Sequence, residues 1–317
     1  MRKIYSFAAP FLLAPLIILN AQSKKGAETI KASDLQSHIS YLASDKLMGR
    51  ATPSPAADSA AEYIAREFKS YGLKPVNGSY FQEVPIKMRA GEFKFKNVVG
   101  FLEGSDPELK KEVLIIGAHY DHVGPYKTPK FEQDSIYNGA DDNASGTAGV
   151  MVNAKAFCSL TERPKRSILF IAFGGEEKGL VGSAYYCKNP LFPLENTVAM
   201  LNMDMISRND PNTVHIVASK KSPDLTKINE KENEKIGMKL DYGQDMFINS
   251  SDHAPFLAKG IPALFYFTGV SKVLHSPKDE PDTIDSSKAE KIARLVFYNA
   301  YFIANDNQRY QFNKEGK

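Results

Sequence analysis

The sequence of 317 residues contains no tryptophan and only two cysteines, Cys158 and Cys187. Two thiols cannot form a structural zinc site of three or four cysteines. They allow a single disulfide in an oxidising compartment, if their Cα atoms come within bonding distance. The alternative is two buried free thiols in separate helices, and the sequence alone leaves both open.

An excess of charge of one sign is also lacking. The 40 Lys and Arg side chains nearly balance 37 Asp and Glu, and the formal net charge is +3. So small an imbalance gives no electrostatic case for a nucleic-acid partner. Beyond the first 20 residues, no apolar run approaches the roughly 20 residues that a bilayer-spanning helix needs. We therefore expect no stable membrane anchor.

Several catalytic motifs are absent as well. The sequence has no Gly-x-Ser-x-Gly elbow, no Walker-type phosphate loop and no His-Glu-x-x-His pair. These patterns would indicate a serine hydrolase, a nucleotide-binding enzyme and a helix-based metalloprotease, respectively. Any catalytic chemistry must therefore come from a different set of residues.

The first residues have the pattern of a cleavable secretory signal. Arg2 and Lys3 precede an apolar stretch at residues 7–19, which ends in small and polar residues. This order is typical of a signal peptide. We expect residues 1–21 to be removed and the chain to be exported, to the periplasm or the medium. The mature chain would then carry 38 basic and 37 acidic residues.

Residues 22–317 fit one large domain, and the pattern within them favours an α/β fold. From residue 93 onward, short β-rich runs alternate with helical ones, which indicates a mixed, mainly parallel sheet flanked by helices on both faces. Two further helices, between about residues 30 and 72, are expected to pack on this core, and no second domain is inserted. Strands are expected at 97–102, 113–118, 168–173, 197–203, 214–218 and 261–267. Later helices are expected at 145–160, 180–188, 223–237, 252–259 and 287–304.

Metal-capable side chains follow three of the expected strands. His119 follows the strand at 113–118, Glu176 and Glu177 follow the strand at 168–173, and Asp204 follows the strand at 197–203. In an open α/β sheet, ligands gather beyond the carboxyl ends of the strands. We therefore expect these side chains to meet at one edge of the sheet. A charge such as Asp204 at the end of an apolar run is rarely buried unless it is paired or coordinated.

Asp141, Asp142 and Asn143 stand just before the helix expected at 145–160. A helix N-terminus stabilises anions, so one of these residues alone is explained as a cap. Two neighbouring carboxylates repel each other unless a cation offsets their charge. The pair of aspartates therefore favours a metal site.

His119 and Asp121 are expected to point to the same side of an extended segment, because side chains alternate along a strand. A histidine ligand commonly gives its other ring proton to a carboxylate, so we assign His119 to metal and Asp121 to its support. Taken alone, His119 is better explained as a structural histidine, and His275 as a surface histidine. Oxygen and imidazole donors without thiolates suit Zn²⁺, with Mn²⁺ or Co²⁺ as substitutes.

Together these motifs resemble the co-catalytic dizinc aminopeptidase family, which includes bacterial leucyl aminopeptidases, glutamate carboxypeptidase II and the glutaminyl cyclases. The resemblance covers nearly the whole mature chain. It rests further on LASDKLMGR at residues 42–50, AAEYIAREF at 60–68, SDHAPF at 251–256 and HSPKDEPDTI at 275–284. Each fragment is short, and the ordered set carries the resemblance.

The resemblance implies two zinc ions per chain. The implied ligands are His119, Asp142 and Asp204 for one ion, and Asp142, Glu177 and His275 for the other. Asp142 would bridge the ions, with a cis peptide bond after it, and Asp141 would be no ligand. Glu176 would take a proton from the attacking water and pass it to the leaving amine.

The function implied is that of an exported metallo-exopeptidase, an aminopeptidase that removes the N-terminal residue from peptides with a free N-terminus. One alternative is a glutaminyl cyclase-like transferase, which typically keeps one zinc and uses tryptophans in its pocket. Another is a non-catalytic binding relative that has lost ligands. The absence of tryptophan and the complete ligand set favour hydrolysis.

Some positions depart from the family or stay open. Where some relatives have a tyrosine that assists the oxyanion, Phe247 and Ile248 stand here, which leaves Tyr242 and Tyr266 as donors to consider. Carboxypeptidase activity would need basic side chains for a terminal carboxylate. The residues available are Arg208 and Arg50, and the loop that carries Arg50 either borders a substrate cleft or is a turn.

Overall fold

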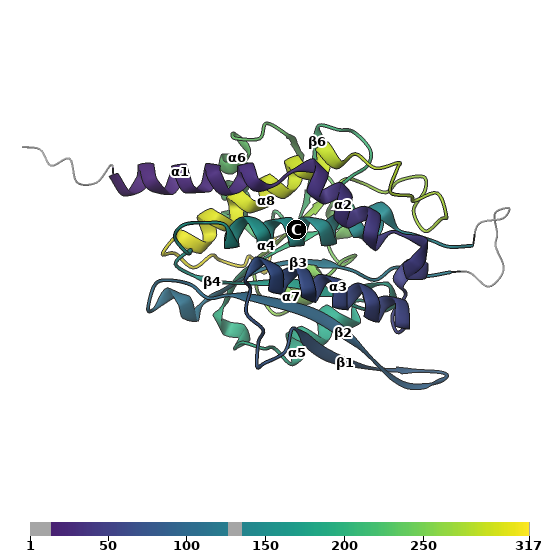
Figure 1. Ribbon diagram of the computed structural model, residues 1–317. Coiled ribbons are helices and arrows are strands. Elements are labelled where there is room, and N and C mark those ends of the chain that lie inside the picture. Colours follow the sequence, from purple (N-terminus) through teal and green to yellow (C-terminus); the bar gives the residue numbers. More distant parts are fainter. Residues whose placement is uncertain (1–13, 126–134, 317) are drawn as a thin grey trace, which may run out of the picture.

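The computed structural model describes residues 14–125 and 135–316 (Figure 1). Within these residues, eight strands form one sheet in the order β1-β2-β4-β3-β5-β8-β6-β7. The strands are β1 (Phe81–Met88), β2 (Gly91–Leu102), β3 (Val113–His119), β4 (Ser167–Phe173), β5 (Thr197–Met203), β6 (Thr213–Val217), β7 (Lys239–Asp241) and β8 (Ala263–Phe267).

The pairing confirms an α/β fold with a mixed sheet. The four central strands β4, β3, β5 and β8 are parallel to one another. Toward the edges, β1 with β2, β2 with β4 and β6 with β8 pair antiparallel, whereas β6 and β7 are parallel. The parallel character predicted for the whole sheet is therefore concentrated in its middle.

Helices cover both faces of this sheet (Figure 1). Every residue of β3, β4, β5 and β8 is buried, as expected for strands between two helical layers. α4 and α8 pack on the sheet from one side, together with α2, α3 and α6, while α5 and α7 pack on the other. The helices are α1 (Ala14–Thr29), α2 (Ala32–Leu42), α3 (Pro55–Tyr71), α4 (Gly146–Cys158), α5 (Val181–Lys188), α6 (Pro223–Asn233), α7 (His253–Ala258) and α8 (Ser286–Asn305).

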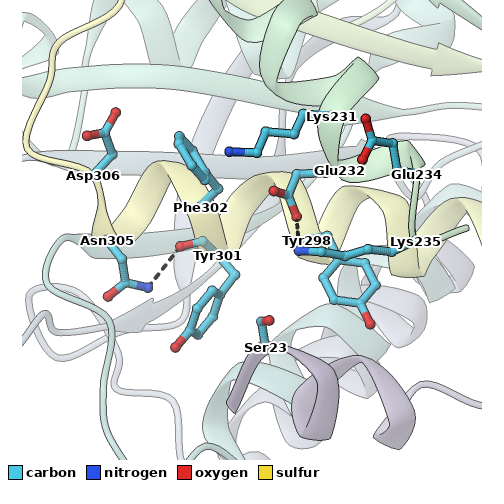
Figure 2. Close-up of a pocket in the computed structure, with 10 residues that line it drawn as sticks. All are labelled: Ser23, Lys231, Glu232, Glu234, Lys235, Tyr298, Tyr301, Phe302, Asn305 and Asp306. Carbon is cyan, nitrogen blue, oxygen red and sulfur yellow. Dashed lines mark hydrogen bonds and ion pairs between the residues drawn. The ribbon is translucent and has the colours of Figure 1, made fainter. Parts of the chain in front are cut away.

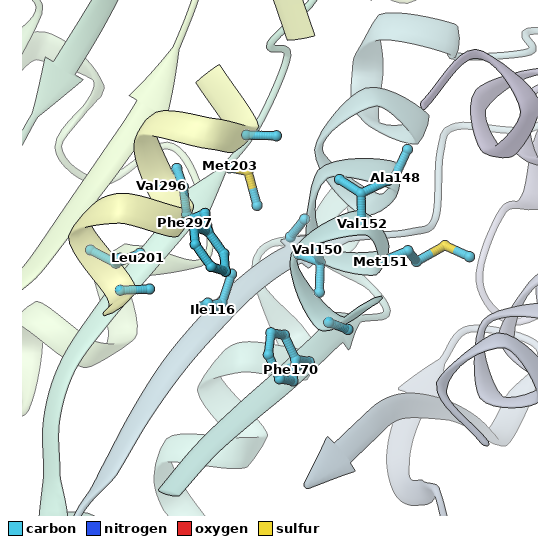
Figure 3. Close-up of a cluster of buried hydrophobic side chains, with 14 of the residues drawn as sticks. Ile116, Ala148, Val150, Met151, Val152, Phe170, Leu201, Met203, Val296 and Phe297 are labelled. Carbon is cyan, nitrogen blue, oxygen red and sulfur yellow. The ribbon is translucent and has the colours of Figure 1, made fainter. Parts of the chain in front are cut away.

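The larger core lies between the sheet and the α4 and α8 layer (Figure 3). Ile116 and Leu201 of the sheet are fully buried there, with Val150 of α4 and Phe297 of α8. Alternate residues of the same strands, such as Ile115, face the second core under α5 and α7. The strands are thus packed against helices on both faces, which fixes the positions of their carboxyl ends.

Among the strands and α-helices of the described residues, three were not predicted from the sequence. β1 contains Pro85, which lowers its strand signal, but β1 is an edge strand and an edge tolerates a missing donor. β7 has three residues, too few for a visible pattern. The third is α1, part of which overlaps the leader expected at residues 1–21.

The expected leader falls mostly outside the described residues, which begin at residue 14. α1 runs from Ala14 through the expected cleavage point at Ala21, and its last turns pack on α4 and α8. Both the leader and the division into residues 1–21 and 22–317 stay predictions. Nowhere in residues 14–125 or 135–316 is a helix long and apolar enough to cross a bilayer.

The two cysteines lie on opposite sides of the sheet. Cys158 ends α4 and packs against the larger core, and Cys187 lies in α5 and belongs to the second core. Both are free thiols. Of the two arrangements left open by the sequence, the structure has the pair of separate thiols.

Candidate metal centre

The structure brings all five predicted ligands to the carboxyl edge of the central strands. Because β3, β4 and β5 are parallel neighbours, the residues that follow them meet at one edge. The five are His119 at the end of β3, Asp142 in the turn η3 (Ala140–Ser145), Glu177 in the turn η4 (Glu176–Lys178) after β4, Asp204 directly after β5 and His275 in the loop after β8.

One donor group forms around His119. Its Nε2 lies 3.3 Å from Asp204 Oδ1 and 3.5 Å from Asp142 Oδ1. The other ring nitrogen, Nδ1, lies 3.1 Å from the backbone carbonyl of Asp121. A carbonyl only accepts, so Nδ1 carries the ring proton and Nε2 presents a lone pair to the two carboxylates. That tautomer suits a metal ligand.

A second donor group forms on the other side of Asp142. His275 Nε2 lies 3.0 Å from Asp142 Oδ2 and 3.2 Å from Glu177 Oε1. The second group also contains His122, whose Nδ1 lies 3.0 Å from the same Glu177 oxygen. The two oxygens of Asp142 thus face different donor groups. The peptide bond from Asp142 to Asn143 is cis, as the resemblance implied.

Two donor oxygens fit metal ions by their burial and their lack of other partners, whereas the side chain of His275 is exposed. Asp204 Oδ1 and Glu177 Oε1 are buried and have no hydrogen-bond partner among the described residues. Buried carboxylates without partners are costly unless a cation neutralises them. The donor atoms are carboxylate oxygens and imidazole nitrogens. Those of His122, Asp142, Glu177 and His275 lie within 4.8 Å of one another, and so do those of His119, Glu176 and Asp204. This chemistry suits Zn²⁺, and the residues present fit two such ions.

Glu176 also reaches the donor atoms around His119. A carboxylate oxygen of Glu176 is within 4.8 Å of donor atoms of His119 and Asp204. The chain reaches this point through a tight turn at Gly175, whose φ is +71° and whose missing Cβ leaves room for the Phe95 ring. Two carboxylates in succession, Glu176 and Glu177, are thereby delivered to the two donor groups.

The protonation of these carboxylates differs because their surroundings differ. Burial raises the pKa of Glu176, and the nearby carboxylates of Asp204 and Asp252 raise it further, against the opposing effect of His119. The pKa of Glu177 is lowered, because the imidazoles of His122 and His275 outweigh the opposing effect of burial. Two adjacent carboxylates with pKa values moved apart are suited to different tasks.

Asp121 supports the site in another way than expected. Its Oδ1 is 3.8 Å from His119 Nδ1, which bonds the Asp121 carbonyl instead. The carboxylate accepts hydrogen bonds from the Thr52 hydroxyl, at 2.8 Å, and from the backbone N–H of Glu176, at 3.2 Å. Asp121 therefore ties the turn that carries Glu176 to the segment after β3.

The sequence profile of Peptidase family M28 matches residues 97–300, which is more than half of the chain. The chain belongs to peptidase family M28. This membership confirms the resemblance to the dizinc aminopeptidases. The matched region contains both donor groups, Asp121 and Glu176.

Curated relatives of the M28 chain include peptidases of fungi. A probable zinc metalloprotease of Pyricularia oryzae is 26% identical over 305 residues, covering 80% of this chain and 59% of the relative. A probable leucine aminopeptidase of Trichophyton verrucosum is 29% identical over 213 residues, covering 62% of this chain and 56% of the relative. The chain spans between about half and two thirds of the length of these relatives.

Solved structures share the fold of the M28 chain. The LapA aminopeptidase of Legionella pneumophila superposes with a TM-score of 0.70 at 21% identity, covering 97% of this chain and 79% of that one. The glutaminyl cyclase of Porphyromonas gingivalis superposes with a TM-score of 0.69 at 17% identity, covering 86% and 98%. Enzymes of two classes thus have this fold, so the function has to be argued from the site.

Arg50 is a buried support that sequence analysis missed. Its guanidinium is fully buried and donates to the backbone carbonyls of Tyr120 at 2.6 Å, Leu42 at 2.9 Å and Gly139 at 2.6 Å, and also to that of Asn138. Burial lowers its pKa to about 10. The bonds to Tyr120, Asn138 and Gly139 hold the segments next to His119 and Asp142, and the bond to Leu42 ties these segments to the end of α2. Arg50 is therefore not available for a substrate carboxylate.

Asp279 and Arg208 form a second support. Asp279 accepts hydrogen bonds from the backbone N–H groups of Asp141 and Asp142 at 3.0–3.1 Å, and from Arg208 at 2.8 Å. Asp141 turns away from the donor groups, and its Oδ1 accepts bonds from the N–H and hydroxyl of Ser207. Arg208 is thus engaged with Asp279, and Asp141 belongs to neither donor group.

A cavity of about 320 Å³ opens directly over the donors. Its remaining wall is largely apolar, with Met205, Phe247, Phe265, Phe267, Val270 and Leu274. The hydroxyls of Tyr242 and Tyr266 do not line it; they donate to Glu230 and Asn229. Neither tyrosine is placed to assist an oxyanion there.

Another cavity, of about 450 Å³, lies between α1, α6 and α8 (Figure 2). Lys235 pairs with Glu232 there and lies over the ring of Tyr298. None of the predicted site residues lines this cavity. Of these two cavities, the one over the donor groups combines reactive side chains with space for a substrate.

Proposed function

We propose that the chain is a zinc-dependent aminopeptidase that removes the N-terminal residue of peptides with the help of two metal ions. The observation that carries this proposal is the arrangement at Asp142, whose two oxygens face separate donor groups. Family membership and the relatives described as metalloproteases and aminopeptidases support it.

In this proposal, His119, Asp142 and Asp204 hold one zinc ion, and Asp142, Glu177 and His275 hold the other. Ions in such a pair supply Lewis-acid activation of a water molecule and of the scissile carbonyl. The protein's own task is to fix the donors. Arg50 and Asp279 serve that task, since both hold the backbone around Asp142 in place.

Glu176 moves the proton. Its carboxylate accepts a proton from the attacking water and delivers it to the amine that leaves when the peptide bond breaks. Asp121 positions Glu176 through the hydrogen bond to its backbone N–H.

The decisive experiment compares one peptide in two forms, with a free and with an acetylated N-terminus. We expect release of the first residue from the free form alone, followed by mass spectrometry of the products. Cleavage of the acetylated form would reject an aminopeptidase. A peptide that begins with glutamine should be shortened by one residue; its conversion to pyroglutamate would indicate the transferase alternative instead.

The apolar wall of the cavity supports a preference for apolar N-terminal residues. We expect kcat/KM for a peptide beginning with Leu or Phe to exceed that of the same peptide beginning with Asp or Lys by at least about 10-fold. A charged N-terminal side chain placed against Phe265 and Phe267 loses its hydration without gaining a partner. An apolar side chain gains binding free energy there, since each methylene buried in such a pocket contributes about 1–3 kcal/mol. Initial rates over the four peptides measure the preference, and faster cleavage of the Asp peptide than of the Leu peptide would contradict it.

A substitution at Val270 tests whether the wall of this cavity sets the preference. Val270 lines the cavity but is 53% exposed, so Val270→Asp leaves the core intact. The variant should lose part of the preference for Leu and gain relative activity on the Lys peptide, because its carboxylate can pair with the lysine. If the order of activity on the four peptides stayed unchanged, residues other than those around Val270 would set the preference.

We also propose that the chain is exported with its first 21 residues removed. Support comes from the basic, apolar and small-residue order of that segment. The mass of the protein recovered outside the cytoplasm should correspond to a chain beginning at Gln22. Recovery of the full-length mass in the cytoplasm would contradict export.

A further inference from the structure

His122 is a buried side chain that the proposed set of five ligands leaves unused. It is fully buried and follows β3 in the same segment as His119 and Asp121. Neither of its ring nitrogens has a hydrogen-bond partner among the described residues. A buried imidazole without partners is unfavourable unless something else satisfies it.

The ring of His122 points at the second donor group. Its Nδ1 lies 3.0 Å from Glu177 Oε1 and 3.6 Å from Asp142 Oδ2. Donor atoms of His122, Asp142, Glu177 and His275 all lie within 4.8 Å of one another. Neighbouring ligands of a tetrahedral zinc ion, with bonds of about 2.0–2.1 Å, are separated by about 3.3 Å. The measured contacts match that spacing.

The contact between His122 and Glu177 is close but is not a hydrogen bond. Glu177 Oε1, like the ring nitrogens, has no partner of hydrogen-bond geometry among the described residues. A protonated imidazole bonded to the carboxylate would require that geometry. Two lone-pair atoms 3.0 Å apart repel each other unless a cation lies between them, and a shared metal ion meets that condition.

The fold makes room for this ring. Gly139 has φ +59°, and a Cβ at this position would lie 2.5 Å from His122 Cγ. A larger residue would push the imidazole off Glu177. On its other side the ring of His275 meets that of His122 edge-on, with centroids 5.3 Å apart. The packing around His122 therefore fixes the orientation of its ring, unlike that of a side chain free to change rotamer at the surface.

We propose that His122 is a fourth protein ligand of the ion held by Asp142, Glu177 and His275. This inference rests on the proposed two-metal function. It makes the two ions unequal. One would have four protein donors, as closed zinc sites do, and the other, beside His119 and Asp204, would have three donors and an open position, as catalytic zinc sites do. The four-donor ion would be the more firmly held.

The test is metal retention in the zinc-loaded protein with His122→Ala. Samples are dialysed against increasing chelator concentrations, and the zinc that remains per chain is measured by mass spectrometry. The wild type should lose one ion first and retain the second. Removing a residue that merely supports a ligand costs about 10- to 100-fold in metal affinity, so loss of a direct ligand should weaken the second ion by at least about 100-fold.

His38→Ala is the matched control. His38 is also buried, but it is bonded to the hydroxyls of Tyr63 and Tyr71 and belongs to neither donor group. This variant should retain zinc as the wild type does. Added imidazole should restore zinc retention to His122→Ala and leave His38→Ala unchanged, because the small molecule can replace the missing ligand.

The outcomes separate this inference from the proposed function. If the wild type holds two ions and His122→Ala retains the second as firmly, the inference is overturned and the two-metal site stands. A wild type that holds fewer than two ions contradicts both. Should His122→Ala not fold, ¹⁵N-histidine NMR of the wild type decides: zinc must shift the Nδ1 resonance of a third histidine besides His119 and His275, and two shifted histidines alone overturn the inference.

Discussion

Replacing Glu176 by Gln is expected to lower kcat by about 100- to 10,000-fold while both metal ions stay bound. Proton transfer by a positioned side chain contributes a factor of this size. The amide has the same size as the carboxylate but cannot accept the proton of the attacking water. Steady-state kinetics, with zinc content measured on the same sample, tests the prediction.

Glu177→Gln is the control for this prediction, because the two glutamates are adjacent and face different donor groups. Glu177→Gln should lose zinc as well as activity. Near wild-type turnover of Glu176→Gln would remove Glu176 from proton transfer. Loss of one ion from Glu176→Gln would make it a ligand of the group around His119.

Replacing Arg50 by Met is expected to lower the free energy of unfolding by about 3–5 kcal/mol. Removing one partner of a buried charged network costs about this much, since the groups left behind lose their hydrogen bonds without gaining water. Here the groups left behind are the carbonyls of Tyr120, Leu42 and Gly139. Urea denaturation of the two proteins at one pH measures the difference.

Two further variants sharpen this test. Arg50→Lys should recover only a minor part of the stability, because one ammonium group cannot reach carbonyls that surround a planar guanidinium. Arg89→Met, in the exposed turn between β1 and β2, should change stability by less than about 0.5 kcal/mol. A loss below about 1 kcal/mol in Arg50→Met would show that Arg50 does not hold the Asp142 segment.

The central strands could be predicted because each is a run of apolar residues buried on both faces. β5 was predicted at its observed bounds, and β3 and β4 to within one residue at each end. The order of the strands could not be predicted, because it depends on contacts between residues far apart in sequence. β1 was missed for a local reason, since Pro85 and exposed polar residues hide its pattern.

Four of the candidate ligands, His119, Asp142, Glu177 and Asp204, could be predicted from the sequence because each stands beside a recognisable element. His275 and the division between two ions came from the family resemblance, and the whole assignment stays a prediction. The side chains that hold the backbone around these candidate ligands could not be predicted from the sequence. Arg50 lies about 90 positions before the carbonyl of Gly139 that it bonds, and Asp279 lies more than 130 after the N–H groups that it accepts from. Such pairs become visible only when the chain is folded.

His122 lies between the residues that the sequence pointed to and those that it hid. It stands in one motif with His119 and Asp121, but the sequence does not show which donor group His122 faces. The alternation of side chains along a strand ends with β3, and the ring turns toward Glu177 in the irregular segment that follows. A second histidine directly after a His-x-Asp pair is the signal that would have marked it.

The central claim is that Asp142 joins two metal ions while the neighbouring Glu176 binds neither. Anomalous diffraction at the zinc edge, from crystals of the zinc-loaded protein, tests it most directly. The account predicts two peaks, one in each donor group, with one oxygen of Asp142 directed to each and the Glu176 carboxylate outside both coordination shells. A single peak, or a Glu176 oxygen at bonding distance from a metal ion, would contradict it.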